Sequence, residues 1–416
     1  MNKKIFFAWL ISLIFVFIWT IENPDKIETL RSSLKIKFKK PDDKNFTENI
    51  SENKKTQVIA NSFKVEIEKV FSLGEKTTFV LNNSENKKVF KKEDVTIFTQ
   101  TGFLLNKQSL EKLKLHKNFT LKYNGGIKTL FFYNKSTYGL ASSFVNDCHY
   151  ASIVNFTTGI EVFKTKCLPD TNDKVDFNGL GSSFVHKNDS IIISLGTPTR
   201  NSTKISNLAQ NQNSNYGKIL KIKKENLNKK EIQPTIFSSG HRTPQGVTQI
   251  ENKIFSVEHG PKGGDELNKI EEAKNYGWPY VSYGTRYLYD EDGRSYKSNH
   301  QSNNFVEPLF SLVPSVGITA VNKCPEKIYN HYKKNCIIAL SLYGNSLRPG
   351  RSLLIFLLDE NFNQVHSVEK IFLGNDYTMR HFMTNSKNEL YEDDKGSIYV
   401  SVDKKGIFKI SFNDFR

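Results

Sequence analysis

Short segments in which apolar and polar residues alternate recur along this chain of 416 residues. The alternation is clear in Phe63–Phe71, Thr77–Leu81 and Val95–Thr99, and it is typical of strands with one buried face. Only one segment, Leu267–Lys274, has the spacing of a short helix. The pattern therefore predicts an all-β architecture.

Further strand candidates follow one another closely between residues 124 and 239, with turn signals such as Lys187-Asn188-Asp189 between them. They are Ser142–Val145, Ala151–Phe156, Glu161–Lys164, Ser182–Val185, Ile191–Leu195 and Lys218–Ile222. Short strands at this spacing favour a sandwich, a barrel or a propeller. The periodicity alone does not choose among these three architectures.

Two unusual loops flank a predicted hairpin in the middle of the chain. The hairpin joins Ile250 to Ile254–Val257 through the turn Glu251-Asn252-Lys253. The loop before it, residues 240–246, reads GHRTPQG, and the loop after it, residues 258–266, reads EHGPKGGDE. Loops of this kind at the ends of neighbouring strands commonly build a ligand site on a rigid sheet.

The amino terminus predicts a membrane anchor. Lys3 and Lys4 precede the uninterrupted apolar run Ile5–Ile21, which as a helix would be about 25 Å long, enough to cross a bilayer core. The basic flank favours an internal amino terminus and an exported remainder. Because no small-residue cleavage site follows, an uncleaved signal anchor over residues 1–22 is preferred to a cleaved signal peptide. We therefore expect a protein anchored by one helix at the periplasmic or extracytoplasmic face.

Two regions separate this anchor from the rest of the chain. Residues 23–62 are rich in Lys, Asn, Asp, Glu and Ser, as expected of a polar tether. Residues 63–120 contain the first strand candidates and no recognisable chemistry. They form either a small β region or a divergent first blade of the domain that follows.

Four cysteines occur, Cys148, Cys167, Cys324 and Cys336, and none belongs to a CxxC pair. A zinc site is therefore disfavoured. Two sequence-local disulfides, Cys148–Cys167 and Cys324–Cys336, would fit an exported protein. Free thiols are the alternative.

The formal net charge is +16, from 59 Lys and Arg against 43 Asp and Glu. The excess is lysine spread along the chain, with no basic helix and no nucleic-acid-binding motif. We interpret it as solvated surface, and we expect no nucleic-acid partner.

Three motifs occur in order within the central region: GHRTPQG at 240–246, EHGPKGGDELN at 258–268 and NYGWP at 275–279. Together they resemble the soluble pyrroloquinoline-quinone (PQQ) dependent sugar dehydrogenases, the glucose/sorbosone dehydrogenase family. The resemblance implies that residues 121–416 form a six-bladed β-propeller with its active site at the mouth of the central channel. It also implies PQQ and Ca²⁺ as cofactors, and a sugar or a quinone as the small-molecule partner.

The resemblance assigns roles to individual residues. Arg242 and Arg380 would bind PQQ carboxylates, Thr243 and His259 would line the cofactor site, and the carbonyls of Gly260 and Pro261 would bind Ca²⁺. Structural alternatives exist for the first and last of these. Arg242 would instead pair with Asp265 or Glu266, and Gly260-Pro261 would be a turn capped by Asp265 at the start of the helix. Trp278 is expected to be a structural plug more than a ligand contact.

The sequence also departs from the family at Thr243, which stands where the family usually has a cofactor-contacting Asn, and at three further positions. Asn178 stands where the family has its general-base His, and an amide has no useful pKa near neutrality. Asp176 and His259 are the candidate substitutes. Tyr343 replaces a PQQ-binding Lys, and Thr378 replaces one of two Arg residues, which leaves Arg380.

Two functional hypotheses follow. In the first, the chain is an exported, membrane-tethered quinoprotein sugar dehydrogenase with an altered base. In the second, it is a non-catalytic propeller that binds a glycan or a protein at the same mouth.

Overall fold

The computed structural model describes residues 56–414, except 61, 85–88, 108, 171–172, 287–295, 298 and 344–350. The chain divides into two units at residues 49 and 50, and every described residue belongs to the second unit. The predicted anchor over residues 1–22 and most of the tether lie outside the described residues. Among the described residues, no helix has both the length and the hydrophobicity needed to cross a membrane.

The described chain is built almost entirely from antiparallel strands. Four four-stranded sheets follow one another in sequence. They are β7 (Ile127–Tyr133), β8 (Ser136–Val145), β9 (Cys148–Asn155) and β10 (Ile160–Lys164); β11 (Phe184–Lys187), β12 (Ser190–Leu195), β13 (Lys218–Lys223) and β14 (Thr235–Ser239); β15 (Pro244–Ile250), β16 (Lys253–Glu258), β17 (Asp265–Ile270) and β18 (Phe310–Leu312); and β19 (Ile318–Lys323), β20 (Cys336–Ser341), β21 (Ser352–Leu358) and β22 (Val365–Phe372).

A nine-stranded sheet completes the set. One half contains β3 (Thr77–Asn82), β4 (Val95–Thr99), β5 (Phe103–Asn106) and β6 (Ser109–Lys112). The other contains β1 (Thr56–Ile59), β2 (Phe63–Phe71), β23 (Met379–Thr384), β24 (Ile398–Val402) and β25 (Gly406–Asp414). The halves meet through a short parallel pairing of β23 with β3, so this sheet is two blades joined at their inner strands.

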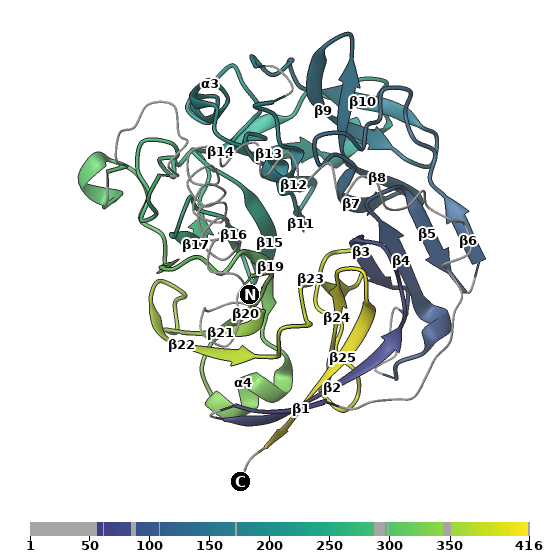
Figure 1. Cartoon of the computed structure of the whole chain (residues 1–416), viewed down its shortest axis with the longest axis vertical. Helices are drawn as coiled ribbons and strands as arrows, with labels where there is room; N and C mark the ends of the chain where they lie inside the picture. Colours follow the sequence, from purple (N-terminus) through teal and green to yellow (C-terminus); the bar gives the residue numbers. More distant parts are fainter. Residues whose placement is uncertain are drawn as a thin grey trace, which may run out of the picture. The chain divides into compact units, whose positions relative to one another are not determined.

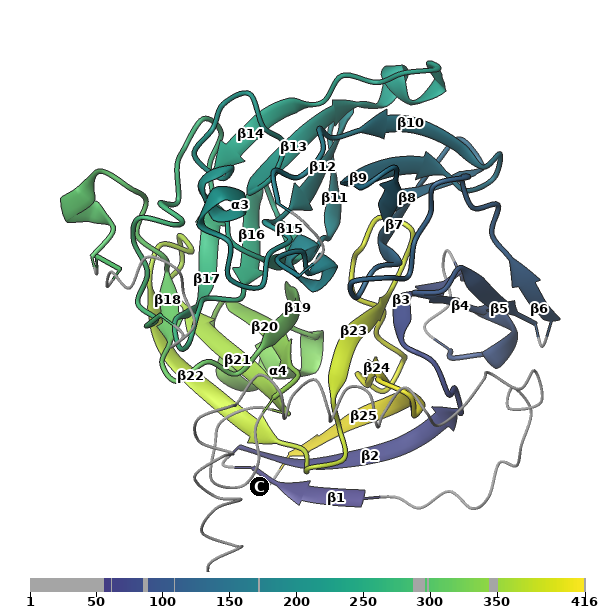
Figure 2. The same cartoon turned by 45° about the horizontal axis from the view of Figure 1, so that its top comes forward.

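The first strands of the blades contact one another around a ring, in the order β3, β7, β11, β15, β19 and β23. Figure 1 shows these strands nearest the middle of a propeller. The ring is closed by strands from both ends of the chain, because β2 pairs along its length with β25 (Figure 2). Residues 63–120 therefore divide between two blades: β2 completes the last one, and β3–β6 make the first. The predicted tether ends earlier than residue 62, since Thr56–Ile59 pairs with β2.

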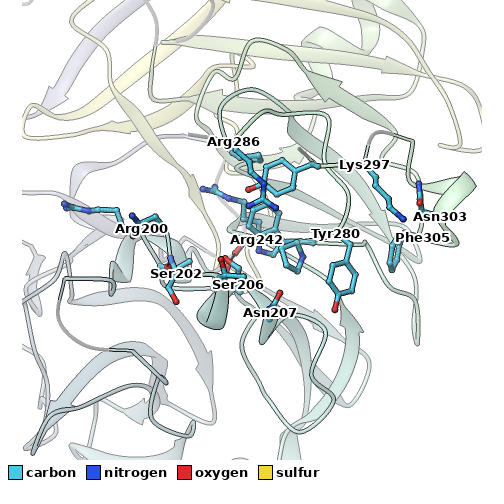
Figure 3. Close-up of a pocket in the computed structure, with 18 residues that line it drawn as sticks. Arg200, Ser202, Ser206, Asn207, Arg242, Tyr280, Arg286, Lys297, Asn303 and Phe305 are labelled. Carbon is cyan, nitrogen blue, oxygen red and sulfur yellow. Dashed lines mark hydrogen bonds between the residues drawn. The ribbon is translucent and has the colours of Figure 1, made fainter. Parts of the chain in front are cut away.

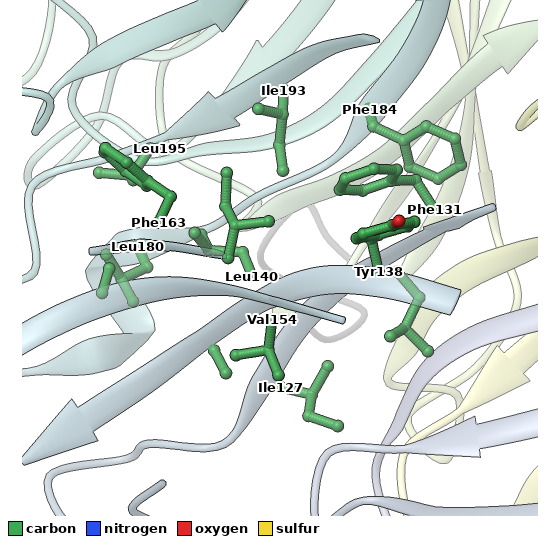
Figure 4. Packing of buried hydrophobic residues seen from close by; sticks show 14 of the residues in the cluster. Ile127, Phe131, Tyr138, Leu140, Val154, Phe163, Leu180, Phe184, Ile193 and Leu195 are labelled. Atoms are coloured by element: carbon green, nitrogen blue, oxygen red, sulfur yellow. The ribbon is translucent and has the colours of Figure 1, made fainter. Parts of the chain in front are cut away.

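Each blade buries both faces against its neighbours. In one cluster, Phe131 stacks on Tyr138 with ring centroids 5.4 Å apart, and Phe184 of the next blade lies 5.9 Å from Phe131 (Figure 4). Aromatic and β-branched side chains suit such sheet-on-sheet packing. The predicted disulfides Cys148–Cys167 and Cys324–Cys336 are both present.

The predicted helix at Leu267–Lys274 is wrong. Residues 265–270 instead form β17, between β16 and β18. Every residue of β17 except Lys269 is buried, because strands cover its edges and other blades cover its faces. Continuous burial removes the alternation that marks a strand in sequence, and the apolar spacing then imitates a helix. Asp265 consequently starts a strand and caps no helix.

Candidate functional site

The two motif loops meet at one end of the hairpin β15–β16. β15 and β16 are antiparallel neighbours, so the end of the loop before β15 lies beside the start of the loop after β16. The backbone N–H of His259 donates to the carbonyl of Thr243 at 3.0 Å. The side chain of Thr243 is buried. The prediction that these loops come together is confirmed.

Arg242 bridges the two loops through carbonyl groups. Its Nη1 donates to the carbonyls of His259 at 3.1 Å and Gly260 at 2.7 Å, and its guanidinium lies 5.2 Å from the ring centroid of Trp278. Among the described residues it makes no ion pair with Asp265 or Glu266. The alternative in which Arg242 pairs with Asp265 or Glu266 is therefore wrong. Arg242 does hold the two loops together, but through the carbonyls of His259 and Gly260.

Asp265 organises the second loop. Its Oδ1 accepts from the N–H of Gly260 at 3.1 Å. Its Oδ2 accepts from the N–H groups of Val316, Gly317 and Ile318 at 3.0, 2.7 and 3.1 Å. The carboxylate is buried, and it ties the Gly260-Pro261 turn to the beginning of β19 in the next blade.

A buried acid pair lies under these loops. Glu258 and Glu266 face each other across β16 and β17, and Nδ2 of Asn268 donates to both, at 2.8 and 3.1 Å. His241 contacts Glu258 at 3.1 Å and His300 contacts Glu266 at 3.5 Å. Burial, and then the nearby Glu258, raise the pKa of Glu266 well above its usual range. A protonated Glu266 removes the repulsion that two opposed carboxylates would otherwise have.

His259 lies on the Arg242 side of the loops. Burial lowers its pKa, with Arg242 adding to the effect against the opposing influence of Asp265. Its Nε2 is buried without a hydrogen-bond partner among the described residues. The ring is therefore neutral near pH 7 and has one unused nitrogen.

Asn178 is an exposed residue of a short 3₁₀ turn. Asp176 precedes the short 3₁₀ turn Phe177–Leu180, and its Oδ1 accepts from the N–H of Asn178 and from Nδ2 of Asn124, both at 3.0 Å. Asn178, Gln245 and Arg380 line a small cavity of about 50 Å³, named here the Asn178 cavity. Asp176 thus has a capping role beside it.

Two lysines that the motifs did not indicate, Lys76 and Lys128, share the Asn178 cavity. Nζ of Lys128 donates to the carbonyl of Asn124 at 2.7 Å. Burial is the main cause that lowers the pKa of Lys128 to about 7; Asp176 opposes this shift, and Arg380 and Lys76 add to it. Burial also lowers the pKa of Lys76. Neither lysine lies in a motif, so only a β-propeller topology could have pointed to them.

The remaining predicted residues have structural partners. Arg380 makes a two-point ion pair with Asp403, with Nε 2.6 Å from Oδ1. Tyr343 is 65% exposed, and its N–H donates to the carbonyl of Val316 at 3.0 Å. Its ring lies against Gly317, where a Cβ would come within 2.3 Å of it. Tyr343 therefore sits beside the loop that Asp265 holds.

A second, larger cavity of about 680 Å³ opens beside Arg242 and Pro261 (Figure 3), and we name it the Arg242 cavity. Trp278 lines it as well. Trp278 is 7% exposed, so it is largely buried, as a plug would be, yet it contributes to the wall.

The implied cofactors fit the described residues differently. PQQ is a tricarboxylate, and the cations Lys76, Arg380 and Arg242 around the two cavities are the donors that such an anion prefers. Ca²⁺ prefers uncharged or anionic oxygen ligands. However, the Gly260 carbonyl already accepts from the cationic Arg242 at 2.7 Å, and the Pro261 carbonyl accepts from Oγ of Ser315 at 3.4 Å. A metal ion on the Gly260 oxygen would meet the guanidinium, so this arrangement fits PQQ and does not fit Ca²⁺.

A family model described as "Glucose / Sorbosone dehydrogenase" matches residues 151–406. Aldose sugar dehydrogenase YliI of Escherichia coli is 46% identical over 54 residues, which are 12% of this chain and 15% of that protein. Quinoprotein glucose dehydrogenase B of Acinetobacter calcoaceticus is 38% identical over 73 residues, 16% of this chain and 15% of that protein. An uncharacterized protein of Synechocystis is 35% identical over 180 residues, 40% of each chain. The matched segments thus span less than half the length of these relatives.

Solved structures extend the similarity over the whole propeller. The apo-form of the soluble aldose sugar dehydrogenase from Escherichia coli has a TM-score of 0.65 at 18% identity, covering 84% of this chain and 100% of that one. The PQQ-bound form of aldose sugar dehydrogenase from Streptomyces coelicolor has a TM-score of 0.54 at 13% identity, covering 84% and 99%. At these identities the structures show a shared fold.

Proposed function

Because this chain belongs to the glucose/sorbosone dehydrogenase family, we propose that it oxidises a sugar with PQQ as its cofactor. The proposal rests mainly on the Asn178 cavity. There, Asn178, at the position of the family base, shares the cavity lining with Lys76, Lys128 and Arg380. Lys76 and Arg380 are suited to an anionic cofactor, and Lys128 is the candidate proton acceptor.

The proposal includes an exported protein that is held to a membrane. The apolar run Ile5–Ile21 behind Lys3 and Lys4 supports the anchor. The disulfides Cys148–Cys167 and Cys324–Cys336 support an oxidising compartment.

Oxidation of a sugar at C1 breaks a C–H bond and an O–H bond and gives a lactone. When bound, PQQ would accept the hydride. The hydroxyl proton goes to Lys128 in this proposal, because Lys128 lines the same cavity as Asn178. The amine becomes an ammonium, and the Asn124 carbonyl that it already contacts stabilises the new charge.

The other two candidates for the base suit this step less well. The carboxylate of Asp176 accepts from Asn178 and Asn124 and caps the 3₁₀ turn. His259 lies with Arg242 and outside the lining of the Asn178 cavity. By contrast, a pKa of about 7 leaves much of Lys128 neutral and able to accept a proton near neutral pH.

Arg242 and Arg380 orient the cofactor in this proposal. Arg242 is fixed on one side by the His259 and Gly260 carbonyls, and Arg380 is fixed by Asp403. Guanidinium groups held in this way can bind carboxylates with little loss of side-chain entropy. Calcium has no step in the proposal, since Arg242 occupies the Gly260 carbonyl.

Titration of the purified chain with PQQ, followed by dye reduction on a panel of aldoses, tests the proposal. We expect saturable one-to-one binding that Arg242→Ala weakens, and turnover of at least one aldose. Because calcium has no step, the same PQQ affinity is expected with added Ca²⁺ and with a chelator. Lack of binding at micromolar PQQ would contradict the proposal and would favour the non-catalytic glycan-binding or protein-binding propeller.

A further inference from the structure

The charged side chains described in the lining of the Arg242 cavity are all positive. Its lining includes four cationic side chains, Arg200, Arg242, Arg286 and Lys297, and no Asp or Glu among the described residues. Figure 3 shows Arg200 and Lys297 toward opposite ends of the cavity, with Arg242 and Arg286 between them. Acids that contact lining residues include Asp170, which accepts from Ser202 and lies 3.7 Å from Lys204, and Glu258, which accepts from the backbone N–H of Arg242 at 2.9 Å. The described lining of the cavity is therefore positively charged, which favours anionic ligands.

Two of these cations are available to a ligand. Arg200 and Lys297 are exposed, and neither makes an ion pair within the described structure. Arg242 uses Nη1 for two carbonyls. Exposed cations spaced along a concave wall discriminate ligands by charge and raise the rate of encounter with anions.

Two aromatic rings lie between two cations along one wall. The guanidinium of Arg242 lies 5.2 Å from the ring of Trp278, Trp278 lies 5.3 Å from Tyr296, and Tyr296 lies 4.3 Å from the guanidinium of Arg286. Tyr280 adds a ring that is 51% exposed. Flat apolar faces with polar edges are suited to stacking against the C–H faces of sugar rings.

The side of the cavity formed by α3 (Thr203–Asn207) is polar and uncharged. Thr203, Ser206 and Asn207 line it, and their side chains have no hydrogen-bond partner among the described residues. Hydroxyl and amide groups both donate and accept, which is what a ring bearing many hydroxyls requires. The cavity of about 680 Å³ lies within the size range of roughly 300–1,000 Å³ typical of ligand pockets.

We propose that the Arg242 cavity binds an acidic saccharide, a short sugar chain that carries carboxylates. Its rings stack on Tyr280 and the Trp278–Tyr296 wall, its hydroxyls bond to the α3 side, and its carboxylates pair with Arg200 and Lys297. The acidic saccharide is the substrate class of the proposed dehydrogenase. Its turnover rests on that proposed function, whereas its binding does not need PQQ.

Calorimetric titration of the full chain without PQQ tests the inference. The probe is trigalacturonate, and its methyl ester is a neutral control of nearly the same shape. We expect saturable binding of the acid, at least tenfold weaker binding of the ester, and an affinity for the acid that falls as salt is added. Equal affinity for the two compounds, or no binding of the acid, would overturn the inference.

Matched variants locate the binding. Arg200→Gln with Lys297→Gln should weaken trigalacturonate roughly tenfold. Lys229→Gln with Lys230→Gln removes the same charge from exposed positions outside the cavity and should leave the affinity unchanged. Tyr280→Ala should weaken the acid and the ester by a similar factor, because stacking does not depend on the carboxylates. Equal losses in the two double variants would mean nonspecific attraction by the net charge of the protein.

PQQ separates this inference from the proposed function. If PQQ displaces trigalacturonate competitively and itself loses affinity in the Arg200→Gln, Lys297→Gln variant, the cavity belongs to the cofactor and the inference fails while the proposed function stands. If trigalacturonate binds as expected and PQQ does not bind, the proposed function fails and the saccharide site stands.

Discussion

The two cavities hold their positive charges in opposite ways. In the Asn178 cavity, Arg380 is paired with Asp403, and burial lowers the pKa values of Lys76 and Lys128. In the Arg242 cavity, Arg200 and Lys297 are exposed, and no Asp or Glu of the described chain lines the cavity with them. The crowded, partly buried lysines change protonation state easily, which suits proton transfer. The exposed cations suit the selection of an anionic ligand.

Among the substitutions considered, loss of Asp265 should have the largest effect, and that effect is on the free energy of unfolding. Its buried carboxylate accepts four backbone N–H groups from two blades. We expect Asp265→Ala to lower the free energy of unfolding by about 4 kcal/mol, because buried charge-assisted hydrogen bonds are lost and the donors stay unsatisfied. Urea unfolding measures the change. The exposed Asp189→Asn should change the unfolding free energy by less than about 0.5 kcal/mol, and a similar loss in both variants would contradict the role of Asp265.

Lys128→Met should give the next largest effect, on catalysis alone. Removal of a proton acceptor typically lowers kcat about 100-fold, while the neutral thioether chain fills a similar volume and should keep the fold. Steady-state kinetics and a melting curve separate the two effects. Lys117→Met, at an exposed position, is the control. Unchanged kcat in Lys128→Met would return the search for a base to His259.

The pH dependence of the rate provides a second test of Lys128 as the proton acceptor. Lys128 accepts a proton only when it is neutral, and its neutral fraction rises as the pH increases through about 7. The rate at low substrate should therefore rise through that pH in the unmodified chain. The same rise in the Lys128→Met variant would show that another group titrates.

Restoring a missing cation should have a smaller effect, on the affinity for PQQ. Tyr343→Lys places an ammonium at the position where the resemblance expects one, beside the loop that Asp265 holds. A charge-assisted contact with a carboxylate should tighten PQQ binding about tenfold. Tyr343→Gln is the neutral control, and equal affinities for the two variants would place the PQQ carboxylates elsewhere.

The smallest expected effect is electrostatic. Lys76 is one of the cations that hold down the pKa of Lys128. Lys76→Met should therefore shift the pH midpoint of the rate upward by less than about one unit. Lys404→Met changes an exposed charge that acts on Lys76 and not directly on Lys128, and should leave the midpoint in place. A downward shift in Lys76→Met would exclude the proposed coupling.

Local patterns were sufficient for the framework of the site. The turn at Glu251-Asn252-Lys253 places the two motif loops at one end of a hairpin, because an antiparallel pair brings its outer ends together. The two disulfides could also be predicted from the sequence, since each joins strands or loops that are close in the chain. The predicted anchor, however, stays an expectation that falls outside the described residues.

Long-range contacts explain what local patterns missed. β17 looked helical because burial on both faces hides its alternation. The alternative in which Arg242 pairs with Asp265 fails because Asp265 turns its carboxylate toward Val316, Gly317 and Ile318, about fifty residues later in the chain. Lys76 and Lys128 could be recognised as site residues only from the structure, in which they line one cavity with Asn178 and Arg380.

By itself, the sequence determined an all-β chain, the hairpin with its two motif loops, the cysteine pairing and the family to which these motifs point. These features depend on residues close together in the chain or on a signature read directly from it. Only the tertiary structure decided which cations share a cavity, which are neutralised by acids and which remain exposed. The reason is physical: burial and the distances between charges, which set both pKa and binding preference, are fixed when the closing strands β2 and β25 complete the ring.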